Sequence, residues 1–432
     1  MRPSARPLAA ALVALASPAA WANGQTTHVW ISREARQLVA DGALGDLVRD
    51  PALEAALVHG TMFPDGGYPL GHPYGEAAHW EPFQGAYLAW IRRTYGPPYD
   101  DEEARQHVAF LLGLASHGMA DQTFDAHYQN RSQGYDGALG WAAGDSMDEA
   151  TDFEWAWLTG PQEVPERFVP AATLVEVFAE RGIDVDEATL DEGQDLLELA
   201  IGLVGLGSQA EEGLVRHREG FPWATSHMQD PDLPGTPARE AEVIALYWAE
   251  VWGRLHDLQP EDVILHTHPA EGGWVPSTDP ESPDSRITIT FRRSLHSDDI
   301  VPEAFLVEGP EGPLAVQTWL FYGTDSHIVH LVPVEPWPTD AELVVTVRAG
   351  LPDRLGGVLA ADATFTVTTE APPPEDSGCR FCEDEGADIA DLEGTDEPKS
   401  RCEGCASGPG QGLGAGLLGL LALVVGWRRR RG

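Results

Sequence analysis

Residues 113–127 read Gly-Leu-Ala-Ser-His-Gly-Met-Ala-Asp-Gln-Thr-Phe-Asp-Ala-His, and this segment is the most informative in the chain. Apolar residues recur every three or four positions over 104–120, which predicts a helix. On a helix, His117 and Asp121 are one turn apart and project from the same face. An imidazole and a carboxylate at this spacing can bind one divalent metal ion, and His127 is expected just past the end of the helix.

Apolar residues with helical spacing also occur on both sides of this segment. Apolar residues recur with helical spacing in 29–39, 195–206 and 239–255. Clusters of Pro and Gly at 64–67 and 95–98 separate the helical segments. Because no strand-like alternation occurs before residue 286, we expect an all-α domain over 23–258.

A different sequence pattern begins after a predicted linker over 259–285, and this linker is rich in Pro, Ser and Asp from residue 276. Apolar and polar residues then alternate in 286–291, 318–322, 328–332, 342–347 and 364–368. Short strands at this spacing predict a small β-sandwich over 286–370. The segments ITITF, ELVVTVRAGLPDRLG and ATFTVTT resemble bacterial Ig-like domains, which usually act as spacers or binding modules.

The N-terminus is typical of an exported protein. Arg2 and Arg6 precede an apolar run, and Ala20-Trp21-Ala22 fits a cleavage site. Residues 1–22 are therefore predicted to be a signal peptide, with Asn23 as the mature N-terminus.

The C-terminus is predicted to attach the protein to the cell surface. An acidic tether over 371–406 contains all four cysteines of the chain, and 407–432 contains an apolar run followed by four arginines. The cysteine pairs have a spacing that zinc could use, although in an exported chain disulfides or a modified cysteine are expected instead. The order of cysteines, apolar segment and arginines resembles myxobacterial sorting tails, which implies processing at Cys405. The alternative is a plain single-pass anchor.

The charge of the chain argues against one class of partner. Asp and Glu number 69 against 27 Lys and Arg, for a formal net charge of −42. Nucleic-acid binding requires clustered basic residues, so no nucleic-acid partner is expected. Because the helical domain contains no cysteine, thiol catalysis is excluded there.

The helical domain offers further metal-ligating side chains with apolar or aromatic neighbours. They are His28 in TTHVWI, Asp65 in MFPDGGYP, His79 in AAHWEPF, and Asp148 with Asp152 in MDEATDF. The last pair is again one helical turn apart. Polar residues in such surroundings are expected to point into a cleft.

These motifs resemble the zinc-dependent phospholipase C superfamily, and most of all the catalytic domain of glycosylphosphatidylinositol-specific phospholipase D. TTHVWISREA, MFPDGGYP, HWEPF, FLLGLASHGMAD and EATDF occur in that family's order. The resemblance implies an all-α domain that binds two or three zinc ions. By position, one ion would be bound by Asp65, His79, His117 and Asp121, and a second by His28, Asp121 and Asn23.

The implied third ion would be bound by His127, Asp148 and Asp152. The family has a histidine at the position of Asp148, so this site departs from the pattern. Asp65 is implied to orient or deprotonate the attacking water.

The function expected from this resemblance is metal-dependent hydrolysis of phospholipids, of phospholipase C or D type, at a membrane surface outside the cell. One alternative is a non-catalytic surface protein with a degenerate metal site. The other is a phosphodiesterase like the related single-strand nucleases, which the acidity disfavours.

Overall fold

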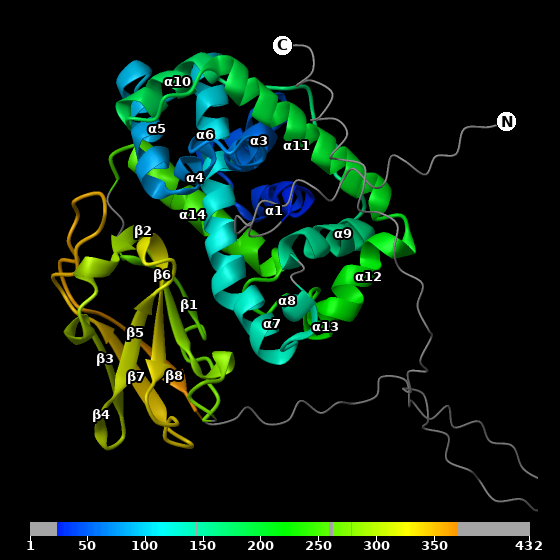
Figure 1. Ribbon diagram of the computed structural model, residues 1–432. Coiled ribbons are helices and arrows are strands. Elements are labelled where there is room, and N and C mark those ends of the chain that lie inside the picture. The colour runs from blue at the N-terminus through cyan, green and yellow to red at the C-terminus, as the bar shows by residue number, and fades with distance from the viewer. Residues whose placement is uncertain (1–23, 144–145, 259–261, 278, 370–432) are drawn as a thin grey trace, which may run out of the picture. The chain divides into compact units, whose positions relative to one another are not determined.

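The computed structural model of the 432-residue chain describes residues 24–143, 146–258, 262–277 and 279–369 (Figure 1). The predicted signal peptide, Asn23, the acidic tether with Cys405 and the C-terminal anchor lie outside the described residues.

The first part of the described chain is helical, as the sequence predicts. Its elements are α1 (Gln25–Leu38), α2 (Ala43–Val48), η1 (Pro51–Leu53), α3 (Glu54–Met62), η2 (Phe63–Leu70), α4 (Tyr74–His79), α5 (Glu81–Thr94), α6 (Glu102–Thr123), η3 (Phe124–Gln129), α7 (Asn130–Tyr135), α8 (Leu139–Ala143), α9 (Met147–Thr159), α10 (Ala171–Glu180), α11 (Glu187–Gly207), α12 (Glu211–Gly220), α13 (Pro222–His227) and α14 (Pro237–Leu255). η1 and η2 are 3-10 helices and η3 is a π-helix. None of the described helices is long and apolar enough to cross a membrane.

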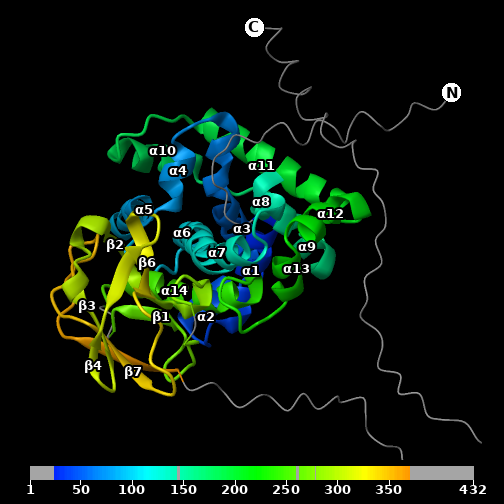
Figure 2. The same cartoon turned by 60° about the horizontal axis from the view of Figure 1, so that its bottom comes forward.

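Helix α6 is the central element of the helical part (Figure 2). Its N-terminus is capped by Asp101, whose carboxylate accepts the backbone N–H of Glu103 at 2.8 Å. Every residue from 107 to 123 is buried, which explains why its apolar pattern extends around the helix. The polar side chains on α6, His117 and Asp121 among them, are therefore held inside the domain.

The close crossing of α3 and α6 depends on two glycines. A Cβ atom added to Gly113 would lie 2.1 Å from the carbonyl oxygen of Leu57, and one added to Gly60 would lie 2.2 Å from that of Phe110. Backbone therefore packs directly on backbone at this crossing, which leaves no room for a side chain at either position.

Replacing Gly113 with alanine is expected to lower the free energy of unfolding by about 1–3 kcal/mol, because the new methyl group forces the two helices apart. Gly202→Ala is the matched control. Gly202 lies on α11 with no atom within 4 Å of its would-be Cβ, so alanine there should be neutral or stabilise by up to about 1 kcal/mol. Chemical denaturation measures both, and equal stabilities of the two variants would contradict this account of the crossing.

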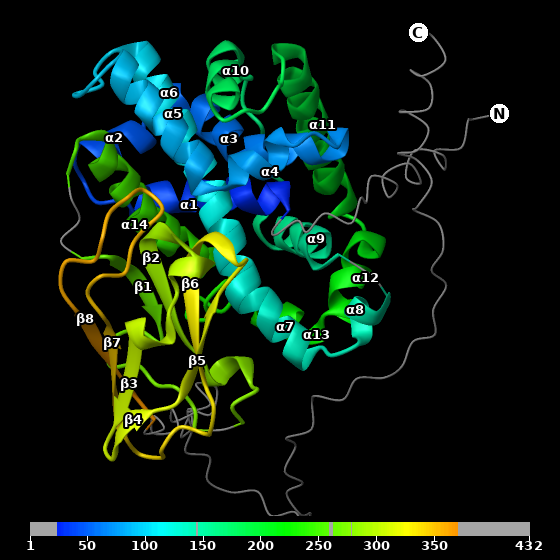
Figure 3. The same ribbon diagram turned by 60° about the vertical axis from the view of Figure 1, so that its left-hand side comes forward.

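The second part of the described chain consists of two four-stranded antiparallel sheets (Figure 3). Its strands are β1 (Ile264–His268), β2 (Ile287–His296), β3 (Phe305–Gly309), β4 (Gly312–Leu314), β5 (Val316–Leu320), β6 (Thr324–Pro333), β7 (Glu342–Val347) and β8 (Ala363–Thr368). The strand orders are β1-β2-β6-β5 and β4-β3-β7-β8. One apolar core takes side chains from both sheets, including Ile289, Val329 and Val345. The Ig-like assignment of this region remains a prediction.

Strand β1 corrects the predicted linker. Residues 264–268 lie inside the range 259–285 and pair with β2 in the register Ile264↔Phe291 and His268↔Thr288. This strand is not predicted from the sequence, because residues 264–268 read Ile-Leu-His-Thr-His and do not alternate between apolar and polar side chains. His266 and His268 are half-buried in this strand.

Candidate metal centre

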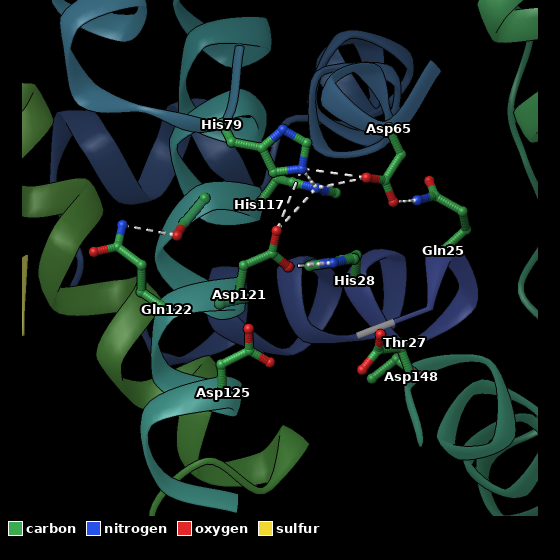
Figure 4. Close-up of polar contacts among 12 residues, drawn as sticks. Gln25, Thr27, His28, Asp65, His79, His117, Asp121, Gln122, Asp125 and Asp148 are labelled. Carbon is green, nitrogen blue, oxygen red and sulfur yellow. Dashed lines mark hydrogen bonds and ion pairs between the residues drawn. The ribbon is translucent and has the colours of Figure 1, made fainter. Parts of the chain in front are cut away.

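Two compact groups of metal-ligating side chains occur in the described part of the chain (Figure 4). One group is Asp65, His79 and His117, and the other is His28, His117 and Asp121; within each group the ligand atoms all lie within 4.8 Å of one another. All five side chains are buried. His117 belongs to both groups, so they form one continuous site.

Four segments of the helical part supply these five residues. His28 lies on α1, Asp65 on η2 and His79 at the last position of α4, whereas His117 and Asp121 lie on α6. Gly118 allows α6 to approach α4, since a Cβ atom there would lie 2.0 Å from the carbonyl oxygen of His79. Gly118 therefore allows the end of α4 and the interior of α6 to bring His79 and His117 together.

The backbone sets the tautomers of His79 and His117. The Nδ1 atom of His79 lies 2.7 Å from the carbonyl oxygen of Gly75, and that of His117 lies 2.7 Å from the carbonyl oxygen of Thr61. A carbonyl only accepts, so each Nδ1 carries the hydrogen. In the neutral imidazoles the Nε2 lone pairs then face each other at 3.0 Å, an arrangement that a shared cation would stabilise.

The carboxylates of Asp65 and Asp121 each approach both of these nitrogens. Asp65 Oδ1 lies 3.2 Å from Nε2 of His79 and 3.5 Å from that of His117. Asp121 Oδ2 lies 3.4 Å from both nitrogens. Ligands at about 2.0–2.1 Å from a tetrahedral zinc ion are about 3.3–3.4 Å apart, so each carboxylate lies at a ligand-like distance from the two histidines.

The second group joins the first through Asp121. The other oxygen of this carboxylate, Oδ1, lies 2.9 Å from Nε2 of His28. The rings of His28 and His117 are stacked with their centroids 3.9 Å apart. Asp121 therefore bridges two imidazole-bearing positions, as the resemblance implies for two neighbouring ions.

Burial and mutual charge shift the pKa values of these groups. Burial raises the pKa of Asp121 to about 7, against the opposing effect of His117 and His79. Burial lowers the pKa of His79, but the hydrogen bond to Asp65 and the nearby carboxylates outweigh it and raise the value to about 9. The interactions of Asp65 with His117 and His79 likewise outweigh its burial, so its pKa is lowered. Without a cation, a proton on His79 balances part of the carboxylate charge.

Zinc binding is therefore expected to weaken as the pH falls. The metal binds the deprotonated forms, and His79 with its pKa of about 9 must lose a proton. Between about pH 7 and pH 9 the apparent association constant should rise about tenfold per pH unit and level off above that window. Below about pH 7 the proton on Asp121 should make the dependence steeper. Calorimetric titration with zinc across this range tests the expectation, and an affinity that does not change with pH would contradict it.

The predicted third set of ligands is not gathered in the described structure. His127 lies against the rings of His268 and His330, at centroid distances of 5.7 and 6.1 Å. The sequence predicts that the helix ends before His127, but the π-helix η3 continues it to Gln129. Because the helix continues, the residue that shares a face with Asp121 is Asp125, four positions later.

Asp148 and Asp152 are buried but differ in their partners. Asp152 accepts the backbone N–H groups of Thr26 and Thr27 at 3.2 and 2.7 Å, so it stabilises the first turn of α1. Asp148 accepts a hydrogen bond from Gln129 at 3.2 Å, and burial together with Asp121 and Asp65 raises its pKa. The third metal site remains a prediction.

The structure adds two residues that the sequence alone does not identify. The side-chain amide of Gln25 donates to Asp65 Oδ2, and Asp125 lies buried beside Asp121 (Figure 4). The i, i+4 spacing from Asp121 to Asp125 was a usable signal. No sequence pattern identifies Gln25, because the residue that it contacts, Asp65, lies 40 positions away.

Comparisons with known proteins find a partial sequence relationship. The chain is 34% identical to the phosphatidylinositol-glycan-specific phospholipase D of Bos taurus over 106 residues, which cover 23% of this chain and 12% of the relative. The protein of the same name from Rattus norvegicus is 34% identical over 122 residues, 26% of this chain and 14% of that one. The protein of the same name from Dictyostelium discoideum is 34% identical over 130 residues, which cover 28% of this chain and 14% of that one.

These relationships are local. The chain spans 12–14% of the length of these curated relatives, and no protein-family model matches it. Among solved structures, surface layer protein SbsC, domains 1-6, aligns with 81% of this chain and 46% of its own, at 9% identity. Its TM-score of 0.21 is too low to support a common fold. The chain is thus related in sequence to phosphatidylinositol-glycan-specific phospholipases D over about a quarter of its length.

Proposed function

We propose that this protein is a secreted, surface-anchored, zinc-dependent phosphodiesterase that hydrolyses phospholipids. The observation that carries the proposal is the convergence of the Nε2 atoms of His79 and His117 with the carboxylates of Asp65 and Asp121. The partial similarity to phosphatidylinositol-glycan-specific phospholipases D supports a phosphodiester lipid as the substrate class.

The bound zinc would supply a water molecule of near-neutral pKa and would neutralise charge on the phosphate. The residues of the chain would hold and orient the reactants. His28, Asp65, His79, His117 and Asp121 would bind the metal, with Asn23 completing the second site. Two or three ions are proposed, the third with His127, Asp148 and Asp152.

Asp65 is proposed to orient the attacking water and to accept its proton. Its Oδ1 atom faces both histidines of the first group, whereas Oδ2 accepts a hydrogen bond from Gln25. The pKa of Asp65 is lowered by His117 and His79, so its carboxylate is ionised at neutral pH. Gln25 limits its rotation, so the carboxylate is positioned before substrate binds.

A substrate panel tests the proposal directly. The mature full-length chain, loaded with zinc, is assayed on phosphatidylcholine and phosphatidylinositol vesicles, on the soluble diester bis(4-nitrophenyl) phosphate and on single-stranded DNA. Diacylglycerol as the lipid product indicates cleavage of the C type, and phosphatidic acid indicates the D type. Bound zinc without turnover of any diester would support the non-catalytic alternative, and turnover of DNA alone would support the nuclease alternative.

A further inference from the structure

The β-region contacts the helical part next to the residues of the proposed metal centre. Glu81, two positions after His79, accepts hydrogen bonds from the backbone N–H and the hydroxyl of Ser294 at 2.7 and 2.6 Å. Gln122, the residue after Asp121, accepts the backbone N–H of His327 at 2.8 Å. The sheet β1-β2-β6-β5 is therefore attached to the helices at the segments that carry the predicted ligands.

Tyr322, in the turn between β5 and β6, makes a third contact of this kind. Its hydroxyl donates to Oδ2 of Asp125, and its ring meets the ring of Trp80 edge-on at a centroid distance of 5.2 Å. Trp80 follows His79 directly, and Asp125 lies one helical turn beyond Asp121. Tyr322 thus connects the two segments that carry His79 and Asp121.

The backbone of Tyr322 is held in an unfavourable conformation. Its φ is 61°, in the left-handed region that bulky side chains rarely adopt. Residues held in this region cluster at functional sites. The side chain of Tyr322 contacts Asp125, Trp80 and the ring of Phe321.

Asp125 is a buried carboxylic acid group that has one oxygen without a hydrogen-bond partner among the described residues. Its side chain is 5% exposed, and within the described part of the chain its Oδ1 atom has no hydrogen-bond partner. Burial, Asp148 and Asp121 all raise its pKa. Figure 4 shows its carboxylate next to that of Asp121 on the same side of α6. A buried carboxylate beside other carboxylates is stable when ionised only if a cation is near.

We propose that Tyr322 is a positioning residue of the metal centre: it holds Oδ2 of Asp125 and leaves Oδ1 available to a cation bound near Asp121 and Asp148. The β-region then completes the metal centre instead of acting only as a spacer. This inference rests on the proposed function, because it requires that the centre binds a divalent cation.

Zinc titration of the mature full-length chain tests this role. Tyr322→Phe keeps the aromatic ring against Trp80 but removes the donor to Asp125, so the most weakly bound zinc should lose about 10–100-fold in affinity. The most tightly bound zinc should be unaffected. Asp125→Asn should cause a similar loss, and the double variant should lose little more, because both changes act on one interaction.

Tyr135→Phe is the matched control. The hydroxyl of Tyr135 also donates to a carboxylate of the other part of the chain, Asp284, and Tyr135 is outside the proposed centre. Zinc binding should not change in this variant. An equal loss in Tyr135→Phe and Tyr322→Phe would show a general loosening of the two parts and overturn the positioning role.

The remaining outcomes separate the two proposals. Zinc binding by the unsubstituted chain together with unaltered zinc binding by Tyr322→Phe would overturn the inference and leave the proposed function intact. Absence of zinc from the unsubstituted chain would overturn the metal centre itself. Thermal unfolding of each variant verifies that the comparison is made between folded proteins.

Discussion

Replacing His117 with alanine is expected to abolish both turnover and tight zinc binding. The side chain is fully buried and belongs to both ligand groups, so its loss weakens the whole centre. If about 10–16 kcal/mol of zinc affinity is shared among four ligands, one ligand contributes about 2.5–4 kcal/mol, or a factor of about 10²–10³. Elemental analysis and diesterase assays of the mature chain measure the two effects.

His107→Ala is the control for this substitution. His107 is also a buried histidine of α6, where its Nδ1 atom lies 2.7 Å from the hydroxyl of Tyr87, and it is not part of either ligand group. The two variants should lose comparable stability, but only His117→Ala should lose zinc. Full zinc occupancy in His117→Ala would refute the assignment of the centre.

Asp65→Asn is expected to reduce kcat by about 10²–10⁴-fold, the usual contribution of a general base. Asparagine preserves the shape of the side chain but cannot accept the proton from water. One carbonyl oxygen remains as a ligand, so zinc affinity should fall much less than in His117→Ala. Steady-state kinetics at saturating zinc, with the zinc content measured in the same samples, separates the two effects.

Asp136→Asn serves as the matched control for Asp65→Asn. Asp136 is a buried aspartate that accepts hydrogen bonds from Ser132 and from the backbone of Trp223, outside the ligand groups. The Asp136→Asn variant should be less stable than the unsubstituted chain but should have the same kcat. If Asp65→Asn keeps zinc and turns over within a few-fold of the unsubstituted chain, Asp65 is a ligand or a turn former and not the base.

Local sequence patterns predicted the helices around the metal centre well. Each of the segments 29–39, 104–120, 195–206 and 239–255 coincides with, or extends no more than one residue beyond, one helix of the structure. Helical periodicity is a property of neighbouring residues, so it can be read without knowing the fold. The spacing of His117 and Asp121 belongs to the same class of information, and the structure places both on one face of α6.

The sequence also predicted correctly that residues far apart would meet. Asp65, His79 and His117 span 53 positions and form one of the compact groups. This success came from the ordered motifs of the resemblance and not from periodicity, because spacing alone does not show which helices pack together. The glycines that permit this packing, such as Gly118 beneath His79, have a meaning only once the neighbouring backbone is known.

By itself, the sequence determined an acidic chain with a helical part that carries metal-ligating residues, followed by a β-region. Tertiary structure decided the rest: the π-helix that places Asp125 rather than His127 beside Asp121, the strand β1 inside the expected linker, and the Tyr322 contact at the centre. The physical reason is the distance along the chain over which each kind of interaction acts. Periodicity and capping act over a few residues, whereas a helix register or a hydrogen bond between residues 197 positions apart depends on the packing of the whole fold.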